Sequence, residues 1–556
     1  MARSNTTSAG RRLGEVCEAV ARLLQRFVGI PVAAIMCLVM AVLAVAIVFV
    51  TAYPQYHGSL MRVSAFGELG VSWQLVAPAA VAVAWCAVLA WLAASVLPRF
   101  SVRAVTVASL AVALAVQVVW TTAFMTNYNN FADVVQLDTL AKSLLRHDPN
   151  GFVGIDEWVF PYAGEASGYL LRTPYQAGGV LLFAAMYRLF GVGNMCSIQV
   201  LNVVMNEVSV LATIGIAREV AAGDERGESV VKATAVLACS FVPFLMSATF
   251  VYPNACGFAL ALCSCWASAR AWREAEPDRL RVCLALVGSF LLMWVATMAK
   301  ATVILMAIVL AAAWCLHALR SRRLWEGAVA ALGLVLCLNA SWLPVAVVEA
   351  RTGVRLGEGQ PLLTNVAMGL AWSDVSDLPG WYGNTAFDCF NECEGDMGRQ
   401  SAWVRDRIAR RVAELAADPA YAAGFVGRKL ATEWLDPSYM ALLFSRCCLP
   451  GMRDAGVISG SVDPRGTGYR LVLAVLDGMQ TVLYALCAAG FALVARAGRR
   501  GWQVGTARLM LCGMALCGFV CYVFWEAQSM YVLPFVVAML PVAGSALASV
   551  PLGRAR

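Results

Sequence analysis

About thirteen apolar runs of roughly membrane-spanning length constrain what this chain can fold into. Of its 556 residues, 60% are hydrophobic and only 14% are charged, which leaves more apolar surface than a soluble protein of this length can bury. We therefore expect an all-α polytopic membrane protein. The runs cover 30–52, 74–97, 104–125, 175–190, 195–217, 233–250, 253–269, 282–299, 301–319, 325–347, 470–495, 508–525 and 530–550.

Basic residues between the runs predict the orientation of the chain, because cytosolic loops carry an excess of Lys and Arg. Arginines precede the first run and gather again at 270–281, 320–323 and 496–508, so these segments are expected in the cytosol. Two polar regions, 126–176 and 348–469, then fall outside. Counts of membrane crossings made from the two ends of the chain disagree by one between residues 175 and 250. The run at 175–190 is short for a span, and this leaves twelve or thirteen spans.

These observations predict six consecutive parts. They are a cytosolic N-terminal segment (1–29), the first transmembrane helices (30–125), a first large outer loop (126–176), a transmembrane core (177–347), a second large outer loop (348–469), and C-terminal transmembrane helices with a short cytosolic tail (470–556). The N-terminal segment has no small-residue cleavage site and is interpreted as a cytosolic lead-in.

Three ionisable side chains beside the apolar runs are candidate functional groups. Asp133 follows closely on the run that ends near residue 125, so its carboxylate is expected at the membrane surface, where a general base could meet substrates from both phases. Lys300 falls between two runs, and Arg172 precedes one; together these cations would suit a lipid phosphate. For Asp133 the alternative is a helix-capping or solvated carboxylate, and Asp138 and Asp156 are expected to be surface acids.

Two further acids, Glu207 and Asp477, lie inside apolar runs. Each is either satisfied by a neighbouring helix or part of a transport path. The second possibility keeps a transporter or lipid-linked-saccharide flippase open, although the chain shows no internal hydropathy repeat and its polar regions lie on one side. A scaffold in cell-envelope assembly is a third possibility, under which every carboxylate substitution would be tolerated.

The remaining polar features give weaker predictions. Cys389, Cys393, Cys447 and Cys448 lie in the second polar region, where a disulfide between the two pairs would brace the loop; a metal site is the alternative. The chain has only 3 histidines, which argues against a histidine-based metal centre.

Residues 401–435 predict an amphipathic helix that lies either on the membrane interface or on the outer face of the protein itself, with Trp403, Ile408, Val412 and Leu415 near one face and Arg405, Arg407, Arg410 and Arg411 near another.

Short motifs follow one another between residues 110 and 545. After an apolar run, a loop opens with Phe131 and Asp133; Arg172, Pro174 and Gln176 then lead into a run ending in RLFG. Further along come TFVYPN, MAKATVILM, PLLTNVAMGLAW with PGWYGN, and WEAQSMYVLPF. This ordered series resembles the bacterial GT-C superfamily, the multi-pass glycosyltransferases related to protein O-mannosyltransferases and aminoarabinose transferases (family-39-like).

Three positions depart from the family pattern. Asp133 is followed by Val134, whereas many members carry a second acid there. Asn254 stands where an acid is usual, and Met530 where an arginine is common. The chain therefore has a lone candidate base and weaker anion binding near residue 530.

The resemblance implies a GT-C-like bundle of 12–13 transmembrane helices with two extracytoplasmic loop regions. It also implies inverting transfer of a sugar from a polyprenyl-phosphate carrier to an extracytoplasmic cell-envelope glycan, lipid or protein, with Asp133 as general base. The implied substrate-binding residues are Arg172, Tyr175, Gln176, Tyr252, Asn254, Lys300, Glu526 and Tyr531. The expected partners are membrane lipids, the lipid-linked sugar and the acceptor, with no cofactor, no metal and no nucleic acid. The active site is expected on the extracytoplasmic face of the cell membrane, where Asp133, Arg172 and Lys300 should meet beside one cavity.

Overall fold

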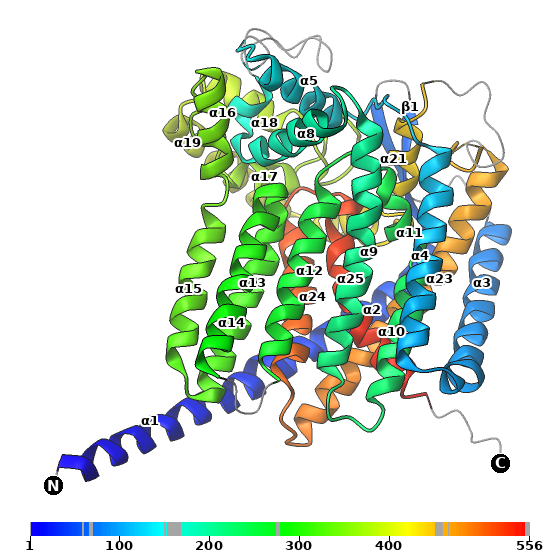
Figure 1. Cartoon of the computed structure of the whole chain (residues 1–556). Coiled ribbons are helices and arrows are strands. Elements are labelled where there is room, and N and C mark those ends of the chain that lie inside the picture. The colour runs from blue at the N-terminus through cyan, green and yellow to red at the C-terminus, as the bar shows by residue number, and fades with distance from the viewer. Residues whose placement is uncertain are drawn as a thin grey trace.

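The computed structural model describes residues 2–57, 60–65, 71–149, 152, 168–273, 278–450, 460–464 and 466–550. These residues form a bundle of long helices with a layer of shorter helices at one end (Figure 1). We call this end layer, built from residues 124–149, 168–190 and 342–447 with a β-hairpin, the cap layer. Among the described residues, 10 helices are long and apolar enough to cross a membrane, or up to 11 if a bent pair is one span. The chain is a multi-pass membrane protein.

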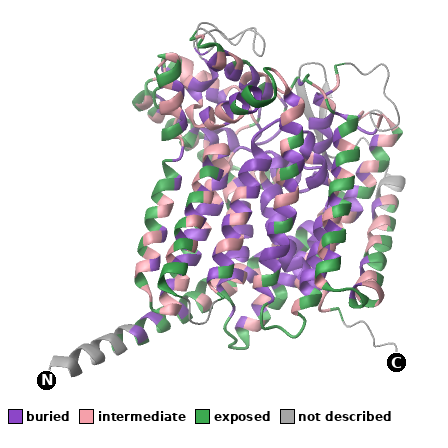
Figure 2. Ribbon diagram, viewed as in Figure 1, coloured by how far each residue is buried: buried purple, intermediate pink, exposed green. Residues whose placement is uncertain are grey.

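The bundle consists mainly of long helices that run between its two ends. They are α2 (Ile30–Phe49), α3 (Val71–Trp91), α4 (Val102–Ala123), α9 (Met195–Val220), α10 (Gly227–Ser240), α12 (Asn254–Ala271), α13 (Arg279–Ala299), α14 (Ile304–Ser321), α15 (Leu324–Leu338), α23 (Thr467–Arg499), α24 (Thr506–Phe524) and α25 (Ser529–Leu547). Helix α1 (Ala2–Leu24) points away from the bundle at the end opposite the cap layer (Figure 1), and α11 (Val242–Met246) is a short helix that follows α10. Helix α25 lies in the interior, and almost all of its residues are buried (Figure 2).

The cap layer is built from shorter elements. They are the antiparallel strands β1 (Ala52–His57) and β2 (Leu60–Ala65), and the helices α5 (Ala132–Arg146), α7 (Tyr169–Arg172), α8 (Ala177–Phe190), α16 (Trp342–Thr352), α17 (Leu363–Gly369), α18 (Thr385–Glu392), α19 (Met397–Ala417), α20 (Pro419–Trp434) and α21 (Ala441–Cys447). Apart from this hairpin and one isolated bridge between Trp372 and Pro379, the described secondary structure is helical, in agreement with the expected fold class.

Helix α8 explains why the sequence-based counts of crossings disagree. It has 14 residues, fewer than a span requires, and it lies in the cap layer against α5 instead of crossing the bundle (Figure 1). Helices α10 and α11 form the bent pair, with an angle of 51° between the two parts. The run at 175–190 is therefore not a membrane span.

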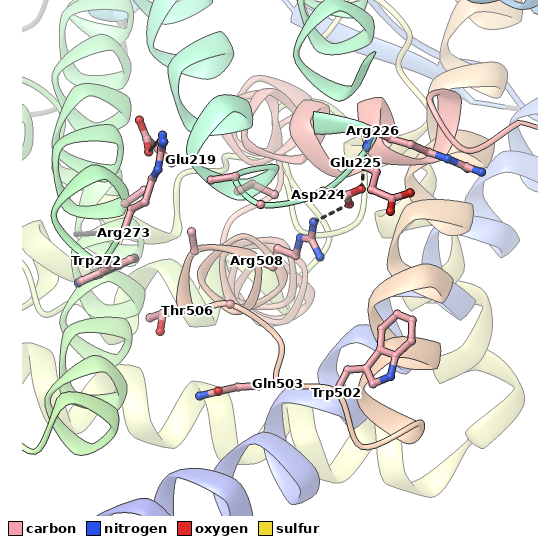
Figure 3. Close-up of a pocket in the computed structure, with 16 residues that line it drawn as sticks. Glu219, Asp224, Glu225, Arg226, Trp272, Arg273, Trp502, Gln503, Thr506 and Arg508 are labelled. Atoms are coloured by element: carbon pink, nitrogen blue, oxygen red, sulfur yellow. Dashed lines mark hydrogen bonds and ion pairs between the residues drawn. The ribbon is translucent and has the colours of Figure 1, made fainter. Parts of the chain in front are cut away.

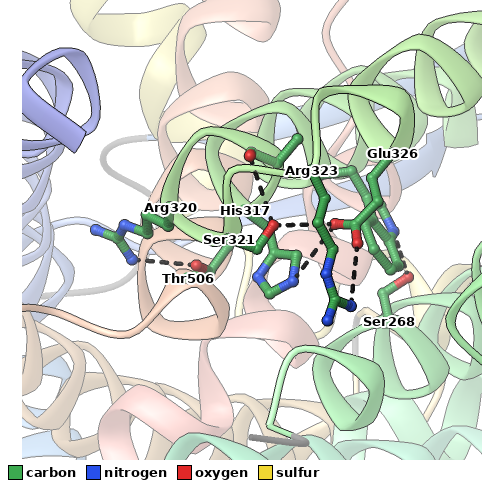
Figure 4. Close-up of polar contacts among 9 residues, drawn as sticks. Ser268, His317, Arg320, Ser321, Arg323, Glu326 and Thr506 are labelled. Atoms are coloured by element: carbon green, nitrogen blue, oxygen red, sulfur yellow. Dashed lines mark hydrogen bonds and ion pairs between the residues drawn. The ribbon is translucent and has the colours of Figure 1, made fainter. Parts of the chain in front are cut away.

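Arginine-rich turns lie at the end of the bundle opposite the cap layer, where they connect helices. The Arg320 guanidinium donates to Val504 O at 2.8 Å and to Gln25 Oε1 at 2.8 Å, which joins α14 to two other segments. The buried Glu326 carboxylate lies 3.7 Å from Arg323 and 3.5 Å from His317 (Figure 4). These cations stabilise the helix ends on the side that the positive-inside rule assigns to the cytosol.

The predicted amphipathic helix at 401–435 is two helices, α19 and α20, which meet at Asp418 and Pro419 because proline is favoured at the start of a helix. Trp403 and Ile408 pack against a small buried cluster that includes Cys389. The helix pair therefore packs on the protein's own surface, which was one of the two expected arrangements.

The expected disulfide between the two cysteine pairs is wrong, because all four cysteines are free. Cys389 and Cys393 lie at α18, whereas Cys447 and Cys448 lie at the end of α21. Cys389 packs with Val404, and Cys448 packs with Phe124 in a different cluster. The Cys448 thiol also accepts hydrogen bonds from Asn129 Nδ2 and Gln199 Nε2, so it joins neighbouring segments without a disulfide.

Candidate functional site

Aromatic packing fixes the start of α5 and with it the position of Asp133. The Phe131 ring meets Phe250 and Phe444 edge-on, with centroids 5.5 Å and 5.4 Å apart. The Phe131 N–H donates to Asn129 Oδ1 at 2.9 Å, which turns the chain into the helix. Asp133 then occupies the first turn of α5, where the helix dipole favours a carboxylate.

Hydroxyl groups surround the half-buried Asp133 carboxylate. The Tyr252 hydroxyl lies 3.4 Å from Asp133 Oδ2, and Gln176 Nε2 donates to the same hydroxyl at 2.7 Å. Burial raises the pKa of Asp133, and this rise is opposed by the positive charge of Lys300, by hydrogen bonds from Tyr169 and Tyr252, and by Arg172. Asp133 is thus a partly desolvated carboxylate facing two cations, as the sequence predicts.

Lys300 reaches this site from the junction of α13 and α14. Its Nζ lies 4.8 Å from the Tyr252 ring centroid and 5.5 Å from that of Tyr531, within the range of cation–π contacts. Burial lowers the pKa of Lys300 to about 8, although the charges of Asp133 and Glu526 act in the opposite direction. The lysine is therefore a buried cation that can lose its charge in mildly alkaline solution.

Glu526 brings a second carboxylate to the site from the turn between α24 and α25. It accepts hydrogen bonds from the Tyr531 hydroxyl at 3.4 Å and from Gln528 Nε2 at 3.2 Å. Burial and the negative charge of Asp133 raise the pKa of Glu526 to about 7, against the effect of Lys300. The two acids and the lysine therefore share one electrostatic environment.

Arg172 is held where the first and second polar regions meet. Its guanidinium lies 4.7 Å from the Phe387 ring centroid, and it hydrogen-bonds to Tyr382. The Gln360 N–H donates to Arg172 O at 3.1 Å. The second polar region therefore covers the cationic side of the site.

A glycine allows the Arg172 segment to lie beside Lys300. An added Cβ on Gly178, at the start of α8, would overlap the carbonyl of Met298, which lies two residues before Lys300. Only glycine permits this approach of the two backbones. The close contact joins segments more than a hundred residues apart in the sequence.

The structure brings eight of the nine sequence-predicted site residues into this group. They are Asp133, Arg172, Tyr175, Gln176, Tyr252, Lys300, Glu526 and Tyr531. Asn254 begins α12 nearby, and its buried side-chain oxygen has no hydrogen-bond partner in the described part of the chain.

Sequence reasoning missed Tyr169, Gln360 and Tyr382. Tyr169 lies three residues before Arg172, and Tyr382 belongs to the quoted PGWYGN motif, so proximity to recognised motifs was the available signal. Gln360 hydrogen-bonds to Tyr175 and carries no such signal. In the described residues, no group of three His, Cys, Asp or Glu side chains could hold a metal ion.

The other candidate acids have structural partners. Gln117 Nε2 donates to Glu207 at 2.6 Å, and the Thr51 hydroxyl donates to Oδ2 of Asp477 at 2.6 Å, so each carboxylate accepts a hydrogen bond from a neighbouring segment. Oδ1 of Asp477 is buried and has no hydrogen-bond partner in the described part of the chain. The expectation of a surface position is wrong for Asp138, which is buried because it joins α5 to α8. Asp156 lies outside the described residues.

Replacement of Asp138 by alanine is expected to destabilise the protein by about 1–3 kcal/mol, because it leaves a buried hydroxyl without its partner. Asp138 accepts from the Tyr187 hydroxyl at 2.6 Å and from Lys142 Nζ at 2.6 Å. Thermal unfolding of purified protein tests this, with the exposed Asp406→Ala on α19 as control. Equal melting temperatures for the two variants would contradict it.

The two cavities described lie elsewhere. One of about 660 Å³ lies at the end opposite the cap layer, between the ends of α9 and α12 and the turn that precedes α24 (Figure 3). The other, of about 20 Å³, lies between α10 and α23. Neither is lined by Asp133, Arg172 or Lys300. The cavity expected beside these three residues stays a prediction.

Comparisons with known proteins give one family match and several distant structural likenesses. A family model described as a family of unknown function (DUF6541) matches residues 168–394. No curated protein matches the sequence. Because the matched family has no known function, it assigns no activity.

The chain is similar in structure to the apo oligosaccharyltransferase of Archaeoglobus fulgidus, with a TM-score of 0.41 and 15% identity over 80% of this chain and 50% of that chain. It is also similar to ArnT from Cupriavidus metallidurans bound to undecaprenyl phosphate, with a TM-score of 0.33 and 14% identity over 79% and 77% of the two chains. The chain spans about half the length of the oligosaccharyltransferase. At these scores and identities, neither likeness assigns an activity to this chain.

Proposed function

We propose that this protein is a membrane glycosyltransferase that moves a sugar from a polyprenyl-phosphate carrier to an acceptor outside the membrane. The observation that supports this most is that a partly desolvated carboxylate, Asp133, shares its surroundings with two cations, Lys300 and Arg172. The carboxylate suits an acceptor hydroxyl, and the cations suit a phosphate leaving group.

In the proposed reaction, the acceptor oxygen attacks the anomeric carbon in a single displacement. The new bond joins that oxygen to the carbon, the bond from the carbon to the carrier phosphate oxygen breaks, and the configuration inverts. Asp133 takes the proton of the acceptor hydroxyl. Lys300 and Arg172 offset the negative charge left on the polyprenyl phosphate. The lipid-linked sugar is a substrate, so the proposal includes no cofactor.

The distribution of charge supports a site outside the cytosol. Residues 270–273, 278–281, 320–323 and 496–508 lie opposite the cap layer, and the positive-inside rule assigns such arginine-rich segments to the cytosol. The cap layer, with Asp133 and Arg172, then faces outward. There, the sugar on a lipid phosphate and a water-borne acceptor can reach the same residues.

Purified protein in liposomes tests this function directly. With polyprenyl-phosphate monosaccharides as donors and cell-envelope extract as acceptor, we expect free polyprenyl phosphate and a glycosylated product to form together without an ion gradient. Movement of the intact lipid-linked sugar across the bilayer, without bond cleavage, would instead support the flippase. Glu207 and Asp477 each accept a hydrogen bond from a neighbouring segment, which is the structural alternative to a role in a transport path.

The rate of transfer is expected to fall as pH rises through about 8, because Lys300 is protonated below its pKa of about 8 and neutral above it. Asp133 must be ionised to accept a proton, so the rate should also fall in acid. Lys300→Arg is expected to remove the alkaline fall, since a guanidinium stays protonated. Profiles of kcat/KM from roughly pH 5 to 10 check this. The same alkaline fall in both proteins would refute the assignment to Lys300.

A further inference from the structure

Lys429 is a buried lysine in α20 that sequence reasoning did not single out. Its Nζ donates to Gly369 O at 2.8 Å, to Val523 O at 3.0 Å and to Trp525 O at 2.6 Å. An ammonium group has three N–H donors, and all three are used here by backbone carbonyls. A neutral amine would leave one carbonyl without its donor, so the contacts favour the charged form.

The three carbonyls belong to two segments that border the site. Gly369 ends α17 in the second polar region, and Trp525 immediately precedes Glu526. A further contact joins the same segments, because the Ala527 N–H donates to Gly380 O at 2.6 Å. Glu526 therefore lies between two points at which its backbone is tied to the second polar region.

The fit around the lysine stem is close. Gly380 has a φ of +76°, and an added Cβ there would come within 2.7 Å of Cδ and Cε of Lys429. Glycine is favoured at this position both by the left-handed backbone and by the lack of space. The aliphatic part of Lys429 thus packs against the turn that leads to Trp381 and Tyr382, and Tyr382 contacts Arg172.

We propose that Lys429 is a positioning residue that fixes the turn carrying Glu526 against the second polar region. It thereby keeps the position of Glu526 fixed relative to Arg172, on the cationic side of the site. The expected change in transfer kinetics rests on the proposed function, whereas the expected change in hydrogen exchange does not. Lys429 does not touch the site carboxylates in any hydrogen bond described. It acts through the backbone on either side of Glu526.

Glu433, one turn further along α20, is a second acidic group whose charge acts on this lysine, besides Glu526. It is fully buried, and neither carboxylate oxygen has a hydrogen-bond partner in the described part of the chain. Burial raises its pKa well above the usual range, against the charge of Lys429. Because Glu433 makes none of the three carbonyl contacts, Glu433→Gln separates loss of the acidic neighbour of Lys429 from loss of the contacts themselves.

Hydrogen exchange of the full-length protein tests the structural effect. In Lys429→Met, we expect the amides of Gly380 and Ala527 to exchange about tenfold faster or more, because three buried carbonyls lose their donor. Exchange in α9 should not change, and Lys142→Met, at a partly exposed lysine of α5, should leave Gly380 and Ala527 unaffected. Glu433→Gln should also leave both amides near the wild-type rate. Unchanged exchange in Lys429→Met would overturn the proposal.

Transfer kinetics test the effect on the site. We expect Lys429→Met to lower kcat by roughly 10- to 10²-fold while the KM for the lipid donor stays near that of the wild type, because Lys300 and Arg172 are intact. The side chain of Lys429→Gln keeps two N–H donors, so its kcat should lie between those of the wild type and Lys429→Met. The glutamine variant also replaces the methionine variant in this test if the latter does not fold. Equal kcat in the wild type and both variants would overturn the kinetic role. If the wild-type protein transfers no sugar, the proposed function fails, whereas the exchange of Gly380 and Ala527 still decides the structural role of Lys429.

Discussion

Replacement of Asp133 by asparagine is expected to lower the rate of sugar transfer by on the order of 10²-fold or more, because the acceptor hydroxyl loses the group that takes its proton. Asparagine keeps the shape of the side chain and can still accept a hydrogen bond from Tyr252, so the fold should be retained. Single-turnover rates with saturating lipid donor measure the effect. The KM for the donor should change little, since the phosphate contacts are not altered.

A surface aspartate provides the control for this experiment. Asp406 on α19 is exposed and pairs with Arg410 at 2.7 Å, so Asp406→Asn changes the same functional group at the same end of the molecule. Its transfer rate should match that of the wild type. If Asp133→Asn also transfers sugar at the wild-type rate, Asp133 is not the base, and its position at the start of α5 is structural.

Replacement of Lys300 by methionine is expected to lower kcat/KM by roughly 10²- to 10³-fold, because a buried cation that stabilises the departing phosphate is lost. Methionine has similar length and keeps contact with the Tyr252 and Tyr531 rings. The pKa of Glu526 should rise further, since Lys300 currently lowers it. The pKa of Asp133 should rise for the same reason, since Lys300 also opposes the effect of burial on it, so the acid limb of the pH profile should move upward.

The matched control is Lys142→Met. Lys142 lies on α5 in the cap layer, where it pairs with Asp138 and is partly exposed. Its loss should leave kcat/KM within about twofold of the wild type, because Asp138 keeps its hydrogen bond from the Tyr187 hydroxyl and the site residues are unchanged. Similar losses in Lys300→Met and Lys142→Met would indicate a general effect of cap-layer charge and would argue against a phosphate site at Lys300.

Much of the fold was predictable because the bilayer imposes a simple length rule. The runs at 195–217 and 508–525 correspond to α9 and α24. The prediction of a membrane span at 175–190 failed because apolarity alone does not distinguish a short span from a buried helix of the cap layer. The disulfide prediction failed for a similar reason, since Cys389 and Cys448 pack in separate clusters that sequence spacing does not reveal.

The candidate site was predictable where a charged residue lay beside an apolar run. Asp133 and Lys300 stood out in this way, and the structure brings them together. Lys429 did not stand out, because it lies within a polar region rich in arginine, where one more cation carries no signal. The proposed role of Lys429 depends on its hydrogen bonds to three backbone carbonyls. These carbonyls come together only in the folded chain, so the sequence does not reveal them.

The most direct test of a phosphate site beside Asp133 is an experimental structure of the protein with bound polyprenyl phosphate. The phosphate is expected between the Lys300 ammonium and the Arg172 guanidinium, with the Asp133 carboxylate facing it and the lipid chain leaving toward the bilayer. A phosphate bound at the opposite end of the bundle, for example among Arg226, Arg273 and Arg508 around the cavity of about 660 Å³, would contradict the proposed function.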